Sequence, residues 1–160
     1  MPKLCESEIE KMAIEELVEL GYTYLSGPDI APDAPFAERN SYSEVLLKKR
    51  LTDAVVRLNP NLSYDVILEA VNKVARISSS NLVADNEAFH KMLVDGVPVE
   101  YRKNGDIVGD YVKLVDFSED GVDNNEFLVV NQFTVIENNN NKRPDILLFI
   151  NGIPMVLFEL

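Results

Sequence analysis

The sequence predicts a fold of the mixed α/β (α+β) class, in which N-terminal helices are followed by a largely antiparallel strand meander. Apolar residues recur every three to four positions as far as residue 94, a period typical of helices that pack on one face. From residue 97 onward, short β-branched and aromatic runs are separated by Gly and Asn, which is typical of strands and turns. With 160 residues and 46% apolar content, the chain can bury a sizeable core, and we expect one domain, residues 1–160.

The helical part of the chain is bounded by capping residues. Ser7 and Glu10 have the spacing of a capping box, and Gly21 lies where a helix-terminating glycine is expected. Ser43 and Ser63 are expected to cap two further helices, because a serine hydroxyl can accept a hydrogen bond from the first helical turn. The expected helices cover residues 7–20, 43–58, 63–77, where the serines at 78–80 end the helix, and 85–94.

Turn residues bound the expected strands. Asn104-Gly105 and Asn151-Gly152 tolerate the positive φ angles that a two-residue hairpin turn requires. Four consecutive Asn residues at 138–141 predict another turn, because Asn adopts left-handed backbone readily. The expected strands cover residues 22–25, 97–102, 111–117, 127–136, 146–150 and 155–158.

The last predicted hairpin has a carboxylate at each end. Asp145 precedes its first apolar run, and Glu159 follows its second. Side chains alternate along a strand, so a simple two-residue loop puts Asp145 opposite Phe158 and leaves Glu159 on the other face. One β-bulge, such as a G1 bulge at Gly152, or an odd-length loop puts the two carboxylates opposite each other. A shared carboxylate site therefore requires a bulge or an odd-length loop, whereas charged hairpin ends that merely reach solvent require neither.

This hairpin is part of a longer string that resembles a known family. Pro144-Asp145, followed by Glu159 and one apolar residue, resembles the PD-(D/E)xK nuclease motif, cut immediately before its Lys. The joined string is similar to the N-terminal nuclease domain of the restriction subunit of type I restriction–modification enzymes. The matching segments are residues 131–135, 143–154 and 158–160, together with Arg57-Leu58-Asn59-Pro60, residues 86–90 and Asp95-Gly96-Val97.

The resemblance implies a restriction-endonuclease-like fold with a carboxylate site for Mg²⁺. Asp145 is expected to be the principal metal ligand and Glu159 the second, with the backbone carbonyl of Leu160 as a third. Nucleases of this fold also place a metal-facing Glu on the first helix, so Glu10 is a further candidate, with the capping box as its alternative role. A hard divalent cation bound by such oxygen ligands can activate water and neutralise the charge of a phosphodiester.

The Lys of the motif is expected one residue after Leu160. We therefore interpret the chain as a fragment of a longer protein. We expect the fragment to be catalytically inactive as it stands, because it lacks this Lys.

The charge balance limits how this chain can contact DNA. It has 15 basic and 27 acidic residues and a net charge of −12, whereas phosphate contacts require Lys and Arg. Lys48, Lys49 and Arg50 lie on one expected helix, and Arg143 precedes the motif, so these four residues are the candidate DNA contacts. A solvated helix face is the alternative for the first three. We expect this chain alone to bind double-stranded DNA weakly.

The resemblance implies the endonuclease domain of a type I restriction enzyme, which is expected to hydrolyse DNA phosphodiester bonds with Mg²⁺ in the restriction of foreign DNA. The resemblance implies modification and specificity subunits as partners. ATP use is implied only through motor domains elsewhere, since no G-x-x-x-x-G-K-[ST] motif occurs here. The alternatives are a nuclease-like fold that serves as a non-catalytic protein-interaction module and a PD-(D/E)xK nuclease of another system.

The sequence also predicts the cellular compartment. No apolar run approaches the length of a membrane span, and the acidic N-terminus does not resemble a signal peptide. Cys5 is the only cysteine, which excludes an intramolecular disulfide and favours a reducing compartment. We therefore expect a cytoplasmic protein that does not enter a membrane.

Overall fold

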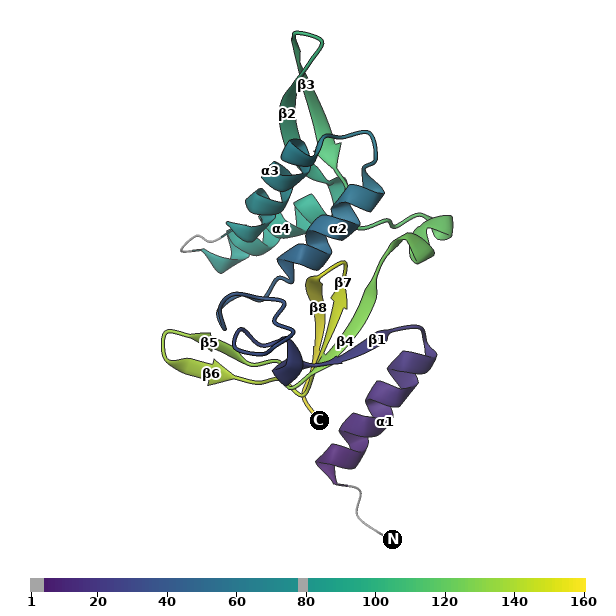
Figure 1. The fold of residues 1–160 in the computed structure, drawn as a ribbon, viewed down its shortest axis with the longest axis vertical. Coiled ribbons are helices and arrows are strands. Elements are labelled where there is room, and N and C mark those ends of the chain that lie inside the picture. Colours follow the sequence, from purple (N-terminus) through teal and green to yellow (C-terminus); the bar gives the residue numbers. More distant parts are fainter. Residues whose placement is uncertain (1–4, 78–80) are drawn as a thin grey trace. The chain divides into compact units, whose positions relative to one another are not determined.

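The computed structural model describes residues 5–77 and 81–160 and divides the chain into two compact units (Figure 1). The sheet unit consists of the residues up to Lys48 together with Glu126–Leu160. The inserted unit consists of Lys49–Asn125. The expectation of one domain over residues 1–160 stays a prediction. Both carboxylates of the terminal hairpin belong to the sheet unit.

A mixed sheet forms the centre of the sheet unit. Its strands are β1 (Thr23–Ser26), β4 (Phe127–Asn131), β7 (Ile146–Ile150) and β8 (Ile153–Phe158). Among the residues described, these four strands pair in the order β1-β4-β7-β8, with β1 parallel to β4 and the other neighbours antiparallel. Together with the helices, this sheet confirms the predicted mixed α/β class.

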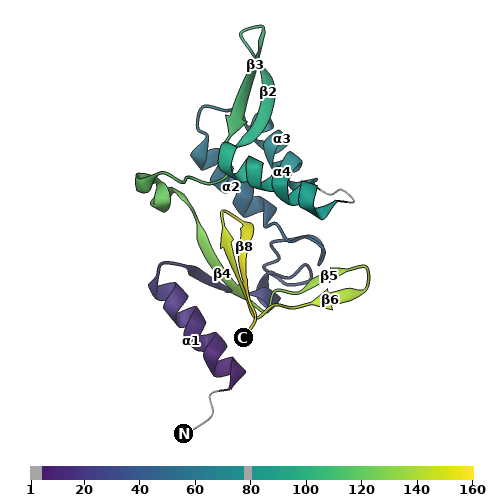
Figure 2. The same cartoon turned by 180° about the vertical axis from the view of Figure 1, so that it is seen from behind.

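The two faces of this sheet are buried by different elements. Side chains alternate along β7, so Ile146 and Leu148 lie on one face and Leu147 and Phe149 on the other. The helix α1 (Glu6–Glu19) lies beside β1 and β4 (Figures 1 and 2). Its Ala13, Ile14 and Leu17 pack against the first face. The second face is covered by Ile30 of the short helix η1 (Gly27–Ile30), by Leu47 and by Phe133.

The inserted unit contains most of the helices. It holds nearly all of α2 (Lys48–Leu58), then α3 (Tyr64–Ala75), α4 (Leu82–Asp95), the hairpin of β2 (Val97–Lys103) and β3 (Asp106–Val112), and the short helix η2 (Glu119–Asn124). The predicted Asn104-Gly105 turn is confirmed, with φ angles of 55° and 94°. The buried side chains of this unit include Leu51, Val55, Ile67, Val71, Val97, Val99 and Val112.

The second predicted helix begins later than expected. Ser43 does not cap it, because α2 begins at Lys48. The backbone before it is committed to tertiary partners: the Leu47 N–H donates to the Gly152 carbonyl at 2.9 Å. The Glu44 carbonyl accepts a hydrogen bond from the Arg39 guanidinium at 3.1 Å. These contacts compete with the helical hydrogen bonds that a start at Ser43 would need.

Two strand predictions are also corrected. The long strand expected over residues 127–136 is broken after Asn131, because Gln132 adopts a left-handed φ of 52°, and it resumes as β5 (Val135–Glu137). β5 pairs with β6 (Asn140–Lys142) across a turn in which Asn138 and Asn139 have positive φ. The strand expected over residues 111–117 begins and ends earlier, as β3 (Asp106–Val112). The two-residue turn at Asn104-Gly105 allows pairing to begin immediately beside it, between Lys103 and Asp106. The serines expected to end the third helix, at 78–80, lie outside the described residues.

Candidate active site at the end of the terminal hairpin

The turn between β7 and β8 is built by Asn151 and Gly152. Their φ angles are 53° and 79°, as a two-residue hairpin turn requires, so the predicted turn is confirmed. Asn151 is fully buried and also bonds a neighbouring segment: its side-chain Oδ1 accepts from the Glu126 N–H at 2.8 Å. Its own N–H donates to the Glu126 carbonyl at 2.9 Å. These bonds fix the turn against the start of β4.

The hairpin contains the register shift that a shared carboxylate site requires. Phe149 pairs with Pro154, but Leu148 pairs with Val156, so Met155 has no opposite residue. This β-bulge confirms the prediction of one extra residue, although it lies at Met155 rather than at Gly152. Pro154 has no N–H to give to a ladder, and proline in sheets is confined to edge strands and bulges, which explains the position.

The bulge determines which residue of β8 lies across from Asp145. Ile146 pairs with Phe158, so the next position in register sets Asp145 opposite Glu159. The Leu160 N–H donates to Asp145 Oδ2 at 2.8 Å, which ties the half-buried Asp145 carboxylate to the end of β8. The structure therefore brings Asp145 and the Leu160 backbone together, and Glu159 is the next residue in register across from Asp145.

The predicted capping box at Ser7 and Glu10 is wrong. Helix α1 begins one residue earlier than expected, and Cys5 and Glu8 form its capping box instead. Glu8 Oε2 accepts from the Cys5 N–H at 2.9 Å, and this hydrogen bond lowers the pKa of the Glu8 carboxyl. Glu10 is consequently available for a different contact.

Glu10 reaches the end of β4. Its Oε1 accepts from Asn131 Nδ2 at 2.7 Å, and its Oε2 accepts from Gln132 Nε2 at 3.0 Å. The Gln132 backbone N–H in turn donates to the Asp145 carbonyl at 3.1 Å. Sequence reasoning assigned no role to Asn131 and Gln132. The signal that could have found them is a pair of polar amides interrupting an otherwise apolar strand pattern.

A groove of about 330 Å³ runs beside Glu10. The Tyr24 hydroxyl donates to Asn131 Oδ1 at 3.0 Å on one side of it, so that Tyr24, Asn131 and Glu10 form a continuous hydrogen-bonded chain. The residues that line the groove are Ser7, Glu10, Lys11, Ile14, Glu15, Tyr24 and Asn131.

The donor set at the hairpin end suits a hard cation. Two carboxylates at paired strand positions and one backbone carbonyl are all oxygen donors, which Mg²⁺ prefers, and the remaining positions of an Mg²⁺ ion are commonly filled by water. Among residues 5–77 and 81–160, no group of three His, Cys, Asp or Glu side chains is placed to hold a metal ion. Glu10 therefore does not complete a three-carboxylate cluster with Asp145 and Glu159.

The four candidate DNA contacts are divided between the two units, although Lys48, Lys49 and Arg50 are consecutive on α2. Lys48 and Arg143 belong to the sheet unit, whereas Lys49 and Arg50 belong to the inserted unit. Lys48 pairs with Glu44 at 3.9 Å, and Lys49 with Asp53 at 2.9 Å. Of the four candidates, only Arg143 lies directly beside the carboxylate hairpin in the sequence and in the same unit.

One buried cation was missed at the sequence level. Arg39 is 3% exposed, and its guanidinium donates to the carbonyls of Thr134 at 2.6 Å and Glu44 at 3.1 Å. It also lies 3.8 Å from the centre of the Phe133 ring. Burial lowers the pKa of this guanidinium, but the group stays charged because its ordinary pKa is so high. Arg39 therefore holds Phe133 and Thr134, the two residues that follow Gln132.

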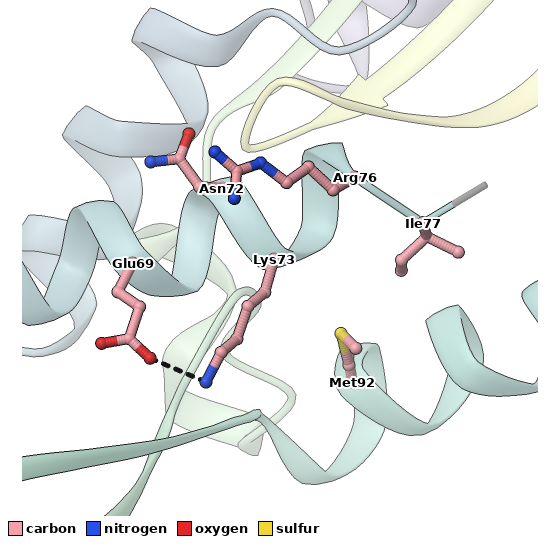
Figure 3. Close-up of a pocket in the computed structure, with 6 residues that line it drawn as sticks. All are labelled: Glu69, Asn72, Lys73, Arg76, Ile77 and Met92. Atoms are coloured by element: carbon pink, nitrogen blue, oxygen red, sulfur yellow. Dashed lines mark ion pairs between the residues drawn. The ribbon is translucent and has the colours of Figure 1, made fainter.

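A second groove lies in the inserted unit between α3 and α4, with a volume of about 410 Å³. Figure 3 shows Ile77 and Met92 facing each other across it, and Lys73 extended to Glu69 at 2.8 Å. Lys73 Nζ also donates to the Pro98 carbonyl at 2.8 Å. This groove contains none of the predicted site residues.

In the described parts of the chain, no helix has the length and apolar character needed to cross a membrane.

Comparison with known proteins identifies the family. A sequence profile described as "Type I restriction enzyme R protein N terminus" matches residues 3–160. The chain is 38% identical over 154 residues to the "Putative type I restriction enzyme MjaIXP endonuclease subunit" of Methanocaldococcus jannaschii, covering 94% of this chain and 14% of that protein. It is also 38% identical over 158 residues to the "Type I restriction enzyme HindI endonuclease subunit" of Haemophilus influenzae, covering 98% of this chain and 15% of that protein.

The chain thus spans about one seventh of the length of these curated relatives. No solved structure matches it significantly. The family profile covers nearly the whole chain, including both carboxylates and the segments that support them. This chain belongs to the family of type I restriction enzyme R protein N termini.

Proposed function

We propose that this chain is the nuclease region of a type I restriction endonuclease subunit and that it hydrolyses DNA phosphodiester bonds with Mg²⁺ held at Asp145 and Glu159. The observation that supports the proposal is the bulge at Met155, because it pairs Ile146 with Phe158 and so makes Asp145 and Glu159 the next positions in register. A hairpin whose charged ends only met solvent would need no bulge. The names of the relatives, both endonuclease subunits of type I restriction enzymes, support the same activity.

Each residue of the site has a separate role in this proposal. Asp145 is the principal ligand, Glu159 is the second, and the carbonyl of Leu160 is the third. The Leu160 N–H orients the Asp145 carboxylate through its 2.8 Å hydrogen bond, which leaves the other oxygen of that carboxylate to face a cation. A bound Mg²⁺ would supply an activated water and neutralise charge on the phosphate.

The whole activity is proposed for a longer protein. The relatives are about seven times as long as this chain. An ATP-driven DNA motor elsewhere in that subunit, and modification and specificity subunits, would bring DNA to the site. We propose that residues 1–160 alone do not cleave DNA, and that the full-length subunit acts in the cytoplasm.

DNA must be held mainly by other parts of that assembly. The sheet unit has six basic residues against fourteen acidic ones, so phosphates are repelled from it on balance. We propose Arg143, with Lys48, Lys49 and Arg50, as the local phosphate contacts. A divalent cation at Asp145 and Glu159 would remove part of the repulsion where the scissile phosphate approaches.

Metal titration combined with plasmid cleavage tests the proposal. Mn²⁺ binding to the full-length subunit is measured by calorimetry, and nicking is followed on the same samples with the partner subunits, ATP and Mg²⁺. We expect Asp145→Ala and Glu159→Ala to abolish the binding and to lower cleavage at least about 100-fold, since a metal contributes several kcal/mol to such a reaction. The matched control is Glu137→Ala, an exposed acid of the same unit.

Two results would contradict the proposal. Retained cleavage in Asp145→Ala would remove the carboxylate pair from the chemistry. No Mn²⁺ binding and no cleavage in the unmodified subunit would favour the protein-interaction module instead, with Asp145 and Glu159 as the solvated ends of a hairpin.

A further inference from the structure

We infer that Glu10 and Gln132 are positioning residues, which hold the backbone at Asp145 in place without themselves binding the metal. This inference rests on the proposed nuclease function. It assigns roles to the carboxylate of Glu10 on α1 and to Gln132, which follows β4 and has a left-handed backbone conformation. The evidence is a line of hydrogen bonds, a constrained backbone corner and the placement of the acidic groups.

A single line of hydrogen bonds joins four elements across the site. Gln132 Nε2 donates to Glu10 Oε2 at 3.0 Å, which links the end of β4 to α1. The Gln132 N–H donates to the Asp145 carbonyl at 3.1 Å, which links it to β7. The Leu160 N–H donates to Asp145 Oδ2 at 2.8 Å, which links β7 to β8. Gln132 therefore contacts Glu10 with its side chain and Asp145 with its backbone.

Glu10 is held by two side-chain amides. Each of its oxygens accepts one amide N–H, from Asn131 at 2.7 Å and from Gln132 at 3.0 Å, and all three side chains are partly buried. Because both oxygens of the Glu10 side chain are engaged, the contact fixes the Gln132 side chain, and through it the orientation of the residue.

The backbone at Gln132 is held by close packing as well as by hydrogen bonds. Its φ of 52° is a left-handed conformation that persists in a non-glycine residue only where the surroundings enforce it. Gly27 lies directly against this corner: a Cβ on Gly27 would be 2.5 Å from the Asn131 carbonyl oxygen and 2.7 Å from the Gln132 carbonyl carbon. The absence of a side chain at Gly27 is what allows the corner to form.

The placement of the acidic groups assigns Glu10 a supporting role. In the described parts of the chain no three acidic, His or Cys side chains are grouped as a metal requires, although Asp145 and Glu159 are opposed. Gln132 stands between Glu10 and Asp145 in the hydrogen-bond line. Glu10 consequently acts on Asp145 through Gln132.

An exchange of the two partners tests the inference in the full-length subunit. Gln132→Glu alone sets two carboxylates against each other, and Glu10→Gln alone removes the charge from the contact. The double variant Glu10→Gln with Gln132→Glu restores an amide–carboxylate pair in the opposite sense. We expect each single variant to lower kcat for DNA cleavage about tenfold, as loss of an outer partner of a metal site does, with KM for DNA unchanged. We expect the double variant to recover most of the activity.

Metal binding separates this role from that of a ligand. We expect Glu10→Gln to keep the Mn²⁺ site, whereas Asp145→Ala loses it. The matched control is Glu16→Gln, the same change at an exposed position of α1, and it should leave kcat and Mn²⁺ affinity unchanged. If Glu10→Gln abolished Mn²⁺ binding as Asp145→Ala does, or if the double variant were worse than either single variant, the inference would be overturned.

A measurement independent of activity keeps this inference separate from the proposed function. Hydrogen exchange at the Gln132 amide reports its bond to the Asp145 carbonyl directly. We expect Glu10→Gln to accelerate that exchange several-fold and Glu16→Gln to leave it unchanged. If the unmodified subunit neither bound Mn²⁺ nor cleaved DNA but the exchange responded as expected, the nuclease function would fail while the link would hold. Unchanged exchange in Glu10→Gln would contradict the link itself.

Discussion

The Asp145 carboxylate accepts a 2.8 Å hydrogen bond from the backbone N–H of Leu160, which lies at the end of the neighbouring strand. The neighbouring pair of Ile146 with Phe158 sets the register at this end of the hairpin, and that pairing depends on one extra residue in β8. The hydrogen bond between Asp145 and Leu160 therefore reports the register of the hairpin. Changes that move the register should be detected first at this site.

The role of the bulge can be tested by deletion. Removing Met155 alone should keep Asp145 opposite Glu159, because Leu148 already pairs with Val156 and the strand becomes regular. Removing Met155 and Val156 together should move Glu159 opposite Ile146 and so to the other face. We expect Mn²⁺ binding to survive the first deletion and to be lost in the second, with circular dichroism checking that both variants are folded. Equal loss of Mn²⁺ binding in both variants would show that the register of Asp145 and Glu159 does not determine metal binding.

Metal-free DNA binding tests the electrostatic interpretation of the site. Asp145→Asn combined with Glu159→Gln removes two negative charges where a phosphate is expected, so DNA affinity in EDTA should rise several-fold over the unmodified chain. Fluorescence anisotropy with a short duplex at low salt measures this change. The control combines Glu19→Gln with Glu137→Gln, which alters the net charge equally at other exposed positions of the sheet unit. An equal rise in the control would assign the effect to net charge.

Gly27→Ala should destabilise the sheet unit. The new Cβ would be 2.5 Å from the Asn131 carbonyl oxygen, and backbone atoms cannot move away as a flexible side chain could. We expect the free energy of unfolding to fall by about 1–3 kcal/mol, the usual cost of overpacking. Urea unfolding measures it. Gly109→Ala, where nothing lies within 4 Å of the added atom, should change stability by no more than about 0.5 kcal/mol.

Arg39 should not tolerate replacement by lysine. Its planar guanidinium donates to the Thr134 and Glu44 carbonyls at once and lies over the Phe133 ring, a geometry that an ammonium group cannot reproduce. We expect Arg39→Lys to lower the free energy of unfolding by about 1–3 kcal/mol, because a half-buried carbonyl loses its partner. Differential scanning calorimetry checks this. A melting temperature equal to that of the unmodified chain would contradict the expected loss.

The stability of the inserted unit should depend on pH through Asp116. Hydrogen bonds from the Asn124 side chain at 2.9 Å and the Ser118 hydroxyl at 2.7 Å lower the pKa of Asp116 from 3.8 to about 2. Since the folded pKa is the lower one, this carboxylate stabilises the fold above pH 4, and the contribution is lost as the pH falls from about 4 to about 2. Asp116→Ala should therefore be less stable than the unmodified chain at pH 7, with the difference vanishing near pH 2.

Asp116→Asn provides the control for that pH dependence. The amide keeps one acceptor oxygen but cannot titrate. Its stability relative to Asp116→Ala should therefore not change between pH 4 and pH 2. Thermal melts recorded at half-unit pH intervals distinguish the three proteins, and a constant difference between the unmodified chain and Asp116→Ala would contradict the assignment.

The sequence by itself determined the mixed fold class, both Asn-Gly turns and the need for one extra residue between the two carboxylates. These features are local. Period, turn chemistry and side-chain alternation depend on residues within a few positions of each other, as at Asn104-Gly105 and Asn151-Gly152. Alternation along one hairpin leaves two outcomes for Asp145 and Glu159, and the bulge at Met155 in the structure, not the sequence, chooses between them.

The tertiary structure decided the features that depend on distant residues. Glu10 bonds Asn131 across 121 positions and Arg39 bonds Thr134 across 95, and no local pattern signals either contact. The Glu10 contact lies beside the break in the strand at Gln132, and Arg39 also bonds the Glu44 carbonyl in the backbone before α2. Local signals leave more than one partner open to a polar group, and the choice among them is made by which segments pack together.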